Sequence, residues 1–305
     1  MFESLPDRVS VYEVSPRDGL QNETAIVPTT KKQRLIEALA ASGLTRIELT
    51  SFVSPKWVPQ LADAEELCTL VDVKSSAVVY SALCPNPKGL DRAIGCGVPE
   101  IGMFISASET HNKKNVNKTV NETLATFGEV CDGARAAGIR VRGYVSTLWG
   151  CPYEGAIDPR KGLAIAHRLI DLGCYQVSLG DTIGVGTPKQ TRDIVKMFLA
   201  ELRPEQIALH MHDTRGTALS NVVVGLECGV RDFDAAVGGL GGCPYAPGAA
   251  GNLATEDLVF TLHGMGVQTG IDLDRLWEAG RVAESIVGRE LPGKVHKAGV
   301  RSLRS

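Results

Sequence analysis

The feature that most constrains the fold is an alternation of short apolar runs, rich in valine and isoleucine, with longer amphipathic segments, which occurs eight times. Short apolar runs bounded by turn residues predict buried strands, and the longer segments have the apolar spacing of helices that bury one face. The predicted strands cover residues 9–14, 46–52, 77–84, 100–107, 140–149, 175–181, 207–213 and 232–240. The predicted helices include residues 30–42, 61–71, 119–137, 159–172, 188–202 and 218–228.

Strand–helix repetition without a linker predicts an α/β fold in which helices cover a parallel sheet. Eight units over roughly 250 residues match the size of a closed (β/α)8 barrel, the TIM barrel. An open doubly wound sheet is the alternative, but it usually has fewer strands and a glycine-rich phosphate-binding turn after the first strand. Here the first strand is followed by Ser-Pro-Arg-Asp-Gly at 15–19, so the closed barrel is favoured.

The composition of the chain does not change along its length, so a single domain is predicted for residues 1–305. The barrel is expected to occupy about 9–266. Residues 267–305 are expected to add an amphipathic C-terminal helix over 273–287, followed by an irregular basic tail from residue 291.

Charge and cysteine content exclude several classes of protein. The net charge is −3, and the absence of a basic run argues against nucleic acid or a membrane surface as a partner. No apolar stretch approaches the roughly 20 residues that span a bilayer, and the N-terminus resembles no targeting segment. The eight cysteines contain no Cys-x-x-Cys pair and are expected to be reduced thiols. These features predict a cytoplasmic protein.

A His-x-His pair in the seventh predicted strand indicates a metal site. Residues 207–213 read Ile-Ala-Leu-His-Met-His-Asp, and side chains two apart on a strand share a face. His210 and His212 therefore project together, and two neutral imidazoles make half of a divalent-metal site. A pair of hydrogen-bonded core histidines is the alternative, which the pair alone does not exclude.

Other polar side chains are predicted to lie at the same end of the barrel as this pair. In a barrel of this type the chemistry lies at the carboxyl ends of the strands. The residues predicted there are Arg17 and Asp18 after the first strand, Glu48 facing inward from the second, Asp181 ending the sixth, His210 and His212 in the seventh, and Cys243 and Asn252 after the eighth. Their convergence on one rim predicts an active site.

Each of these residues also has a purely structural interpretation. Asp18 could turn the chain, Glu48 could pair with a barrel arginine, Asp181 could cap a turn, Asn252 could cap a helix, and Cys243 could be a surface thiol. The run Thr-Glu-Asp at 255–257 is a better helix start, which leaves Asn252 for another role. Cys243 lies in the glycine-rich loop 238–252, and such loops often close over substrate.

Several long motifs resemble one known family. The segments that carry this resemblance are residues 14–23, 47–60, 178–188, 210–214 and 238–257. Together they resemble the 3-hydroxy-3-methylglutaryl-CoA (HMG-CoA) lyase family, and the similarity extends from about residue 9 to 288. Related barrel lyases and Claisen-type synthases share the Arg-Asp-Gly and His-x-His motifs, whereas the Gly-Cys-Pro-Tyr loop at 242–245 favours the lyase branch.

The resemblance implies cleavage of HMG-CoA to acetyl-CoA and acetoacetate, as in leucine degradation. It implies Mg²⁺ or Mn²⁺ held by Asp18, His210, His212 and Asn252. It further places Arg17, Glu48, Asp181 and Cys243 around the reacting carbons. An acyl-CoA substrate and a homo-oligomer, most simply a dimer, are the expected partners.

This chemistry assigns a role to each group. A divalent cation lowers the pKa of a hydroxyl that it binds, and Arg17 would stabilise negative charge on the thioester oxygen. Asp18, Glu48 or His210 would take the hydroxyl proton, a choice that the sequence leaves open. Cys243 would protonate the enolate carbon.

Three other functions remain possible from the sequence. One is a lyase of the same branch that acts on a longer 3-hydroxy-3-alkylglutaryl-CoA or on citramalyl-CoA. The second is a condensing synthase or biotin-linked carboxyltransferase, although the chain has no room for their extra domains. The third is a metal-binding scaffold without activity.

Overall fold

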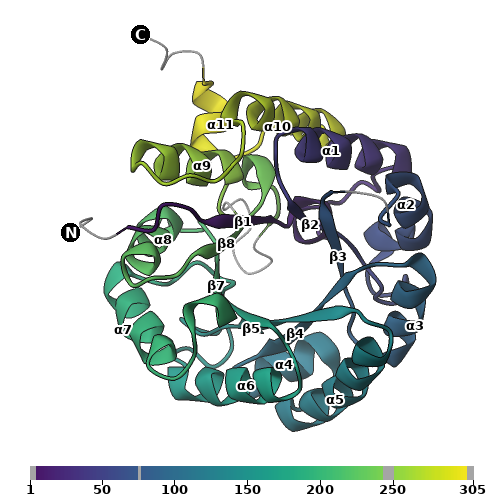
Figure 1. The fold of residues 1–305 in the computed structure, drawn as a ribbon, viewed down its shortest axis with the longest axis vertical. Coiled ribbons are helices and arrows are strands. Elements are labelled where there is room, and N and C mark those ends of the chain that lie inside the picture. Colours follow the sequence, from purple (N-terminus) through teal and green to yellow (C-terminus); the bar gives the residue numbers. More distant parts are fainter. Residues whose placement is uncertain (1–4, 75–76, 243–250, 301–305) are drawn as a thin grey trace.

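The computed structural model describes residues 5–74, 77–242 and 251–300, and within them eight parallel strands close into a barrel (Figure 1). Each strand pairs with the next along the chain, and the first pairs with the last. The strands are β1 (Ser10–Glu13), β2 (Arg46–Ser51), β3 (Val79–Leu83), β4 (Glu100–Ser106), β5 (Arg140–Ser146), β6 (Gln176–Asp181), β7 (Ile207–Met211) and β8 (Asp232–Ala235). The predicted (β/α)8 TIM barrel is confirmed, since every strand falls within its predicted range.

Helices form an outer ring around the strands (Figure 1). They are α1 (Thr29–Ala41), α2 (Ala64–Val71), α3 (Pro87–Cys96), α4 (Glu109–Val116), α5 (Val120–Ala136), α6 (Pro159–Asp171), α7 (Pro188–Leu199), α8 (Ala218–Glu227) and α9 (Thr255–Gly264). Local sequence fixes several of their starts. Thr119 before α5 and Thr187 before α7 each form a capping box with the residue three positions later.

The chain after the barrel contains more structure than predicted. The C-terminal helix α10 (Leu273–Val287) is confirmed, but the expected irregular tail contains a further helix, α11 (Lys294–Ala298). The carboxylate of Asp257 in α9 accepts hydrogen bonds from the backbone N–H groups of Lys294 (3.0 Å) and Val295 (2.6 Å). This helix is too short to be stable alone, so tertiary contacts rather than its own sequence pattern hold it in place.

The two faces of the barrel wall differ in chemistry. On β5, Val141 and Val145 belong to the apolar layer between strands and helices, whereas Arg142 and Tyr144 lie inside the barrel. The apolar layer supplies most of the favourable burial energy, about 1.5–3 kcal/mol for each large side chain. Charged groups inside the barrel are paired: Arg142 lies 2.7 Å from Asp234. Pairing of this kind is what makes a buried charge tolerable.

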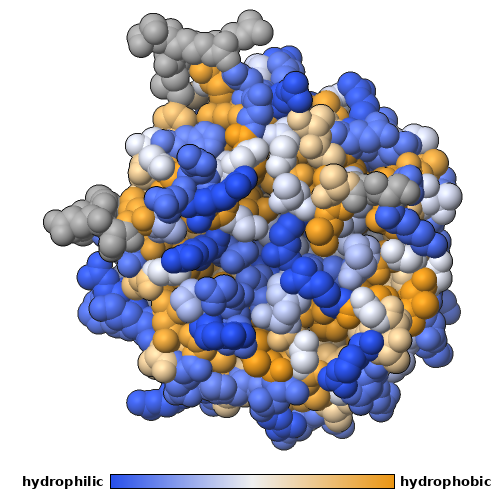
Figure 2. Space-filling view, viewed as in Figure 1, coloured by the Kyte–Doolittle hydropathy of each residue, from blue (hydrophilic) through white to orange (hydrophobic). Residues whose placement is uncertain are grey.

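The surface of the molecule is mostly hydrophilic on the face shown in Figure 2, with hydrophobic residues in small patches. Among the residues that the structure describes, no helix has both the length and the apolar character required to cross a bilayer.

Candidate active site

A single turn of π-helix, η1 (Ser15–Gly19), presents two of the predicted residues at the end of β1. The backbone N–H of Asp18 donates to the carbonyl of Val14 at 2.8 Å, which coils the chain tightly and leaves Arg17 and Asp18 on the rim. Gly19 leaves little space at this point, because a Cβ there would lie 3.1 Å from the Leu240 side chain. The turn therefore packs directly against the loop that follows β8.

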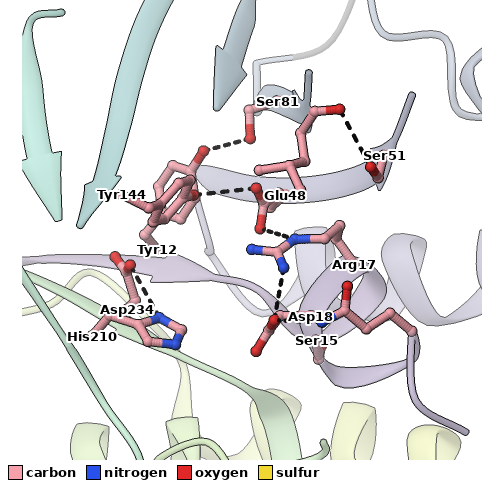
Figure 3. A network of polar contacts seen from close by, with 12 residues as sticks. Tyr12, Ser15, Arg17, Asp18, Glu48, Ser51, Ser81, Tyr144, His210 and Asp234 are labelled. Carbon is pink, nitrogen blue, oxygen red and sulfur yellow. Dashed lines mark hydrogen bonds and ion pairs between the residues drawn. The ribbon is translucent and has the colours of Figure 1, made fainter. Parts of the chain in front are cut away.

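Arg17 lies between two carboxylates (Figure 3). Its Nε donates to Glu48 at 2.6 Å, and its Nη1 donates to Asp18 at 2.7 Å. Glu48 is completely buried and also accepts a hydrogen bond from the Tyr144 hydroxyl at 3.2 Å. Burial raises the pKa of Glu48, and the Arg17 charge opposes that rise. The structure confirms the inward placement of Glu48 and shows that Arg17 is its partner.

The two histidines and Asp18 converge on one point. The Nε2 atoms of His210 and His212 are 3.2 Å apart, and one ligand atom from each histidine and from Asp18 lies within 4.8 Å of the others. Both imidazoles are buried, with exposures of 7% and 6%. Strand alternation therefore places them on one face, as the His-x-His spacing predicts.

Asn252 joins this group from the loop after β8. Its backbone forms an isolated antiparallel β-bridge with His212. The backbone N–H of Leu253 donates to the carbonyl of Met211 at 3.0 Å, which aligns this segment with β7. The Asn252 amide nitrogen then donates to Asp18 at 2.8 Å and to the carbonyl of Leu240 at 3.2 Å. Asn252 is not the cap of α9, which begins at Thr255.

The electrostatics of the cluster favour cation binding. Burial alone raises the pKa of Asp18, but the charge on Arg17 and then the two imidazoles outweigh it, so its pKa falls to about 2. Burial lowers the pKa of His212 to about 3, and His210 adds to that effect. At neutral pH the site therefore presents an ionised carboxylate and a neutral imidazole, the forms that coordinate a metal.

Asp181 holds the loop that follows β6. Its carboxylate accepts hydrogen bonds from the backbone N–H groups of Val185 (3.1 Å) and Gly186 (2.7 Å). A Cβ on Gly186 would approach this carboxylate to 2.9 Å, so glycine is needed for the contact. Asp181 is not among the residues that converge with Asp18 and the histidines. Cys243, the predicted proton donor, lies outside the described residues.

The structure adds residues that the sequence did not reveal as part of the site. These are Tyr144 on Glu48, Glu13 under η1, and the group Arg142, Ser178 and Asp234 behind His210. The sequence does indicate that Asp234 points into the barrel, because it alternates with the apolar residues Phe233 and Ala235 on a buried strand. Which inward side chains meet across the barrel depends on strand register, which no local pattern specifies.

Glu13 anchors both loops of the rim at their base. Its Oε1 accepts from the backbone N–H groups of Ser15 (3.0 Å) and Val237 (2.9 Å), and its Oε2 accepts from the Thr255 hydroxyl (2.6 Å). Burial raises the pKa of Glu13 to about 7, and these hydrogen bonds only partly oppose that rise.

The pKa of Glu13 makes stability dependent on pH. Between the ordinary value of 4.5 and about 7, the folded protein keeps a proton that the unfolded chain has released. The free energy of unfolding therefore falls as pH rises through this window. Between pH 5 and pH 8 we expect Glu13 to lower the free energy of unfolding of the wild-type protein by about 2–3 kcal/mol. Glu13→Gln should lack this decrease, and urea unfolding at the two pH values measures it. Identical pH profiles for the two proteins would contradict this prediction.

The residues fit a divalent cation. Adjacent ligands of an octahedral ion with bonds of about 2.1 Å lie about 3 Å apart, close to the 3.2 Å between the two imidazole nitrogens. The donor set of imidazole nitrogen and carboxylate oxygen is suited to such an ion. Asp18, His210 and His212 thus form a possible metal site.

Comparison with known proteins gives the family. Residues 8–283 match the family model described as HMGL-like. This chain belongs to that family. It is 50% identical over 295 residues to the mitochondrial hydroxymethylglutaryl-CoA lyase of Bos taurus, covering 97% of this chain and 90% of the relative. The family resemblance found in the sequence is confirmed, and membership of this group makes the chain a lyase.

Other members of the family agree in sequence and in structure. The cytoplasmic 3-hydroxy-3-methylglutaryl-CoA lyase of Mus musculus is 48% identical, covering 96% of this chain and 85% of the relative. An HMG-CoA lyase from Acinetobacter baumannii, solved with coenzyme A and 3-methylmalate, is 42% identical with a TM-score of 0.92, covering 98% of this chain and 97% of that one. The carboxyl transferase domain of Rhizobium etli pyruvate carboxylase, at 17% identity and a TM-score of 0.72, shares the fold.

Proposed function

We propose that this chain cleaves HMG-CoA to acetyl-CoA and acetoacetate, the reaction expected in leucine degradation. The observation that carries the proposal is the gathering of Asp18, His210 and His212 beside Arg17 at the rim of a barrel shared with named HMG-CoA lyases. The bound coenzyme A in the Acinetobacter relative supports an acyl-CoA substrate.

The proposed cofactor is Mg²⁺ or Mn²⁺, held by Asp18, His210, His212 and Asn252. When bound, such an ion lowers the pKa of a coordinated hydroxyl and stabilises the alkoxide that forms. Asp18 offers a carboxylate and Asn252 an amide group, and oxygen is the ligand atom that these hard ions prefer.

Arg17 is proposed to bind the thioester oxygen. Glu48 and Asp18 occupy its Nε and Nη1, while its Nη2 makes no hydrogen bond within the described part of the chain. The two carboxylates fix the plane of the guanidinium before substrate arrives, so no reorganisation is needed when negative charge develops.

The proton transfers are assigned to four residues. The hydroxyl proton is proposed to pass to Asp18, Glu48 or His210. Asp18 and Glu48 both contact Arg17, and Asp18 converges with His210. Cys243 is proposed to protonate the enolate carbon. Asp181 is proposed to keep the loop after β6 in place around the reacting carbons, in keeping with its two backbone hydrogen bonds.

The proposed reaction is tested by incubating the purified protein with Mg²⁺ or Mn²⁺ and a panel of 3-hydroxyacyl-CoAs, with products identified by mass spectrometry. We expect acetyl-CoA and acetoacetate from HMG-CoA. Preferential cleavage of a longer 3-hydroxy-3-alkylglutaryl-CoA or of citramalyl-CoA would assign a different substrate within the same branch. No cleavage of any acyl-CoA would refute the proposal.

The ligand assignment gives a separate prediction. We expect His212→Ala to weaken Mn²⁺ binding at least tenfold, measured by calorimetry without substrate, because one of the converging nitrogens is lost. His263→Ala is the matched control, because His263 lies in α9 and contacts Thr269 instead of the cluster. Unchanged Mn²⁺ affinity in His212→Ala would remove this residue from the ligand set.

Domain organisation, oligomeric state and location in the cell are also proposed. We propose a single domain with the barrel in about 9–266, a homodimer, and a cytoplasmic location, the last in keeping with the cytoplasmic relative of Mus musculus. Light scattering after size exclusion tests the dimer, and a single cooperative unfolding transition tests the single domain.

A further inference from the structure

A carboxylate inside the barrel lies behind one of the proposed metal ligands. Asp234 projects inward from β8, and its Oδ2 is 3.3 Å from Nδ1 of His210 (Figure 3). The other nitrogen of that imidazole, Nε2, is the one that faces His212 at 3.2 Å. Asp234 therefore contacts the side of His210 that points away from the proposed metal.

Three further contacts hold Asp234 in this position. Arg142 donates from Nη2 to Oδ1 at 2.7 Å and from Nη1 to Oδ2 at 3.1 Å. The Ser178 hydroxyl donates to Oδ2 at 2.7 Å. The side chains of Arg142 and Asp234 are both completely buried. A paired guanidinium and carboxylate in this geometry keep Asp234 ionised, so it can only accept hydrogen bonds.

An acceptor on one side of an imidazole selects its tautomer. The contact between Oδ2 of Asp234 and Nδ1 of His210 is at ion-pair distance, 3.3 Å. Because Asp234 carries no proton, a hydrogen placed between these two atoms must belong to Nδ1 of His210, and Nε2 is then left with a free lone pair. Neither Nδ1 makes a hydrogen bond of good geometry among the described residues, but the two imidazoles differ in what lies behind them. Oδ2 of Asp234 lies 3.3 Å from Nδ1 of His210, whereas no carboxylate in the described part of the chain is in ion-pair contact with His212.

We propose that Asp234 is a positioning residue that holds His210 as the Nδ1–H tautomer and so directs Nε2 toward the cation, with Arg142 and Ser178 fixing Asp234. This inference rests on the metal set of the proposed function. It deepens that proposal by adding a second layer of residues that reaches the metal site only through His210.

The variant Asp234→Asn tests the tautomer directly. Arg142 would bind the amide oxygen at the Oδ1 position, which turns the amide NH₂ toward His210. That NH₂ would donate to Nδ1 and select the Nε2–H tautomer, which cannot bind a metal through Nε2. We expect a 10- to 100-fold loss of Mn²⁺ affinity, measured by calorimetry or by the spin-resonance signal of free Mn²⁺, without any acyl-CoA.

The matched control is Asp232→Asn, on the same strand. Asp232 lies 3.7 Å from Arg46 and contacts neither histidine. The Asp232→Asn protein should therefore bind Mn²⁺ as tightly as the wild type. Equal affinity in Asp234→Asn and Asp232→Asn, with His212→Ala still impaired, would overturn this inference and leave the metal site intact. If the wild-type protein itself does not bind Mn²⁺, the proposed function is overturned instead.

A second measurement does not depend on the folding of Asp234→Asn. Long-range ¹H–¹⁵N correlation of the ¹⁵N-histidine-labelled wild-type protein reports which ring nitrogen of His210 carries the proton, with His210→Gln used to assign the signal. We expect Nδ1–H in the metal-free protein, retained in Ser178→Ala because Arg142 still binds Asp234. An Nε2–H tautomer in the metal-free wild type would overturn the inference.

Discussion

Arg17→Gln is expected to lower kcat by about 100- to 1000-fold, the largest catalytic effect that we predict for a single substitution. Arg17 contributes a positive charge that is already oriented by Glu48 at 2.6 Å and by Asp18 at 2.7 Å. Glutamine is neutral and shorter, so it cannot reproduce the charge next to a developing oxyanion. Steady-state kinetics with HMG-CoA at saturating Mg²⁺ measure the effect.

Arg135→Gln serves as a control for the loss of a guanidinium. Arg135 is 63% exposed and pairs with Asp132 on the surface of α5, so kcat should not change. Thermal unfolding of Arg17→Gln is measured in parallel, because this substitution leaves the buried Glu48 without its charged partner. A folded Arg17→Gln protein with a kcat within tenfold of the wild type would remove Arg17 from the mechanism.

The largest expected effect on stability is that of Arg142→Met. This substitution leaves the completely buried carboxylate of Asp234 without its counter-charge, and breaking a buried pair in this way costs about 3–5 kcal/mol. Methionine fills part of the space but offers no donor to the two carboxylate oxygens. Urea unfolding at pH 7 measures the loss.

The double variant Arg142→Met/Asp234→Leu separates this penalty from the value of the pair itself. Replacing both charges with apolar groups removes the uncompensated carboxylate, so we expect most of the lost stability to return. Lys189→Ala is the surface control, since the Lys189–Asp193 pair is exposed and its loss should change stability by less than about 1 kcal/mol. A double variant no more stable than Arg142→Met would contradict this account.

The barrel and most of the cluster followed from the sequence because both depend on short-range periodicity. Strand alternation placed His210 and His212 on one face, and the rule that barrel strands end at one rim brought Asp18 and Asn252 toward them. The segment 294–298 was predicted as irregular because its helix is held by Asp257, 37 residues earlier. A contact of that kind leaves no local pattern.

The sequence by itself determined the number and order of the strands, the family, and the convergence of Asp18 with His210 and His212. Only the tertiary structure decided which groups become partners: Arg17 with Glu48, Asn252 with Asp18, and Asp234 with His210 and Arg142. The physical reason is that periodicity sets the direction of a side chain from its own backbone. Its partner across the barrel is set by the register and closure of all eight strands together.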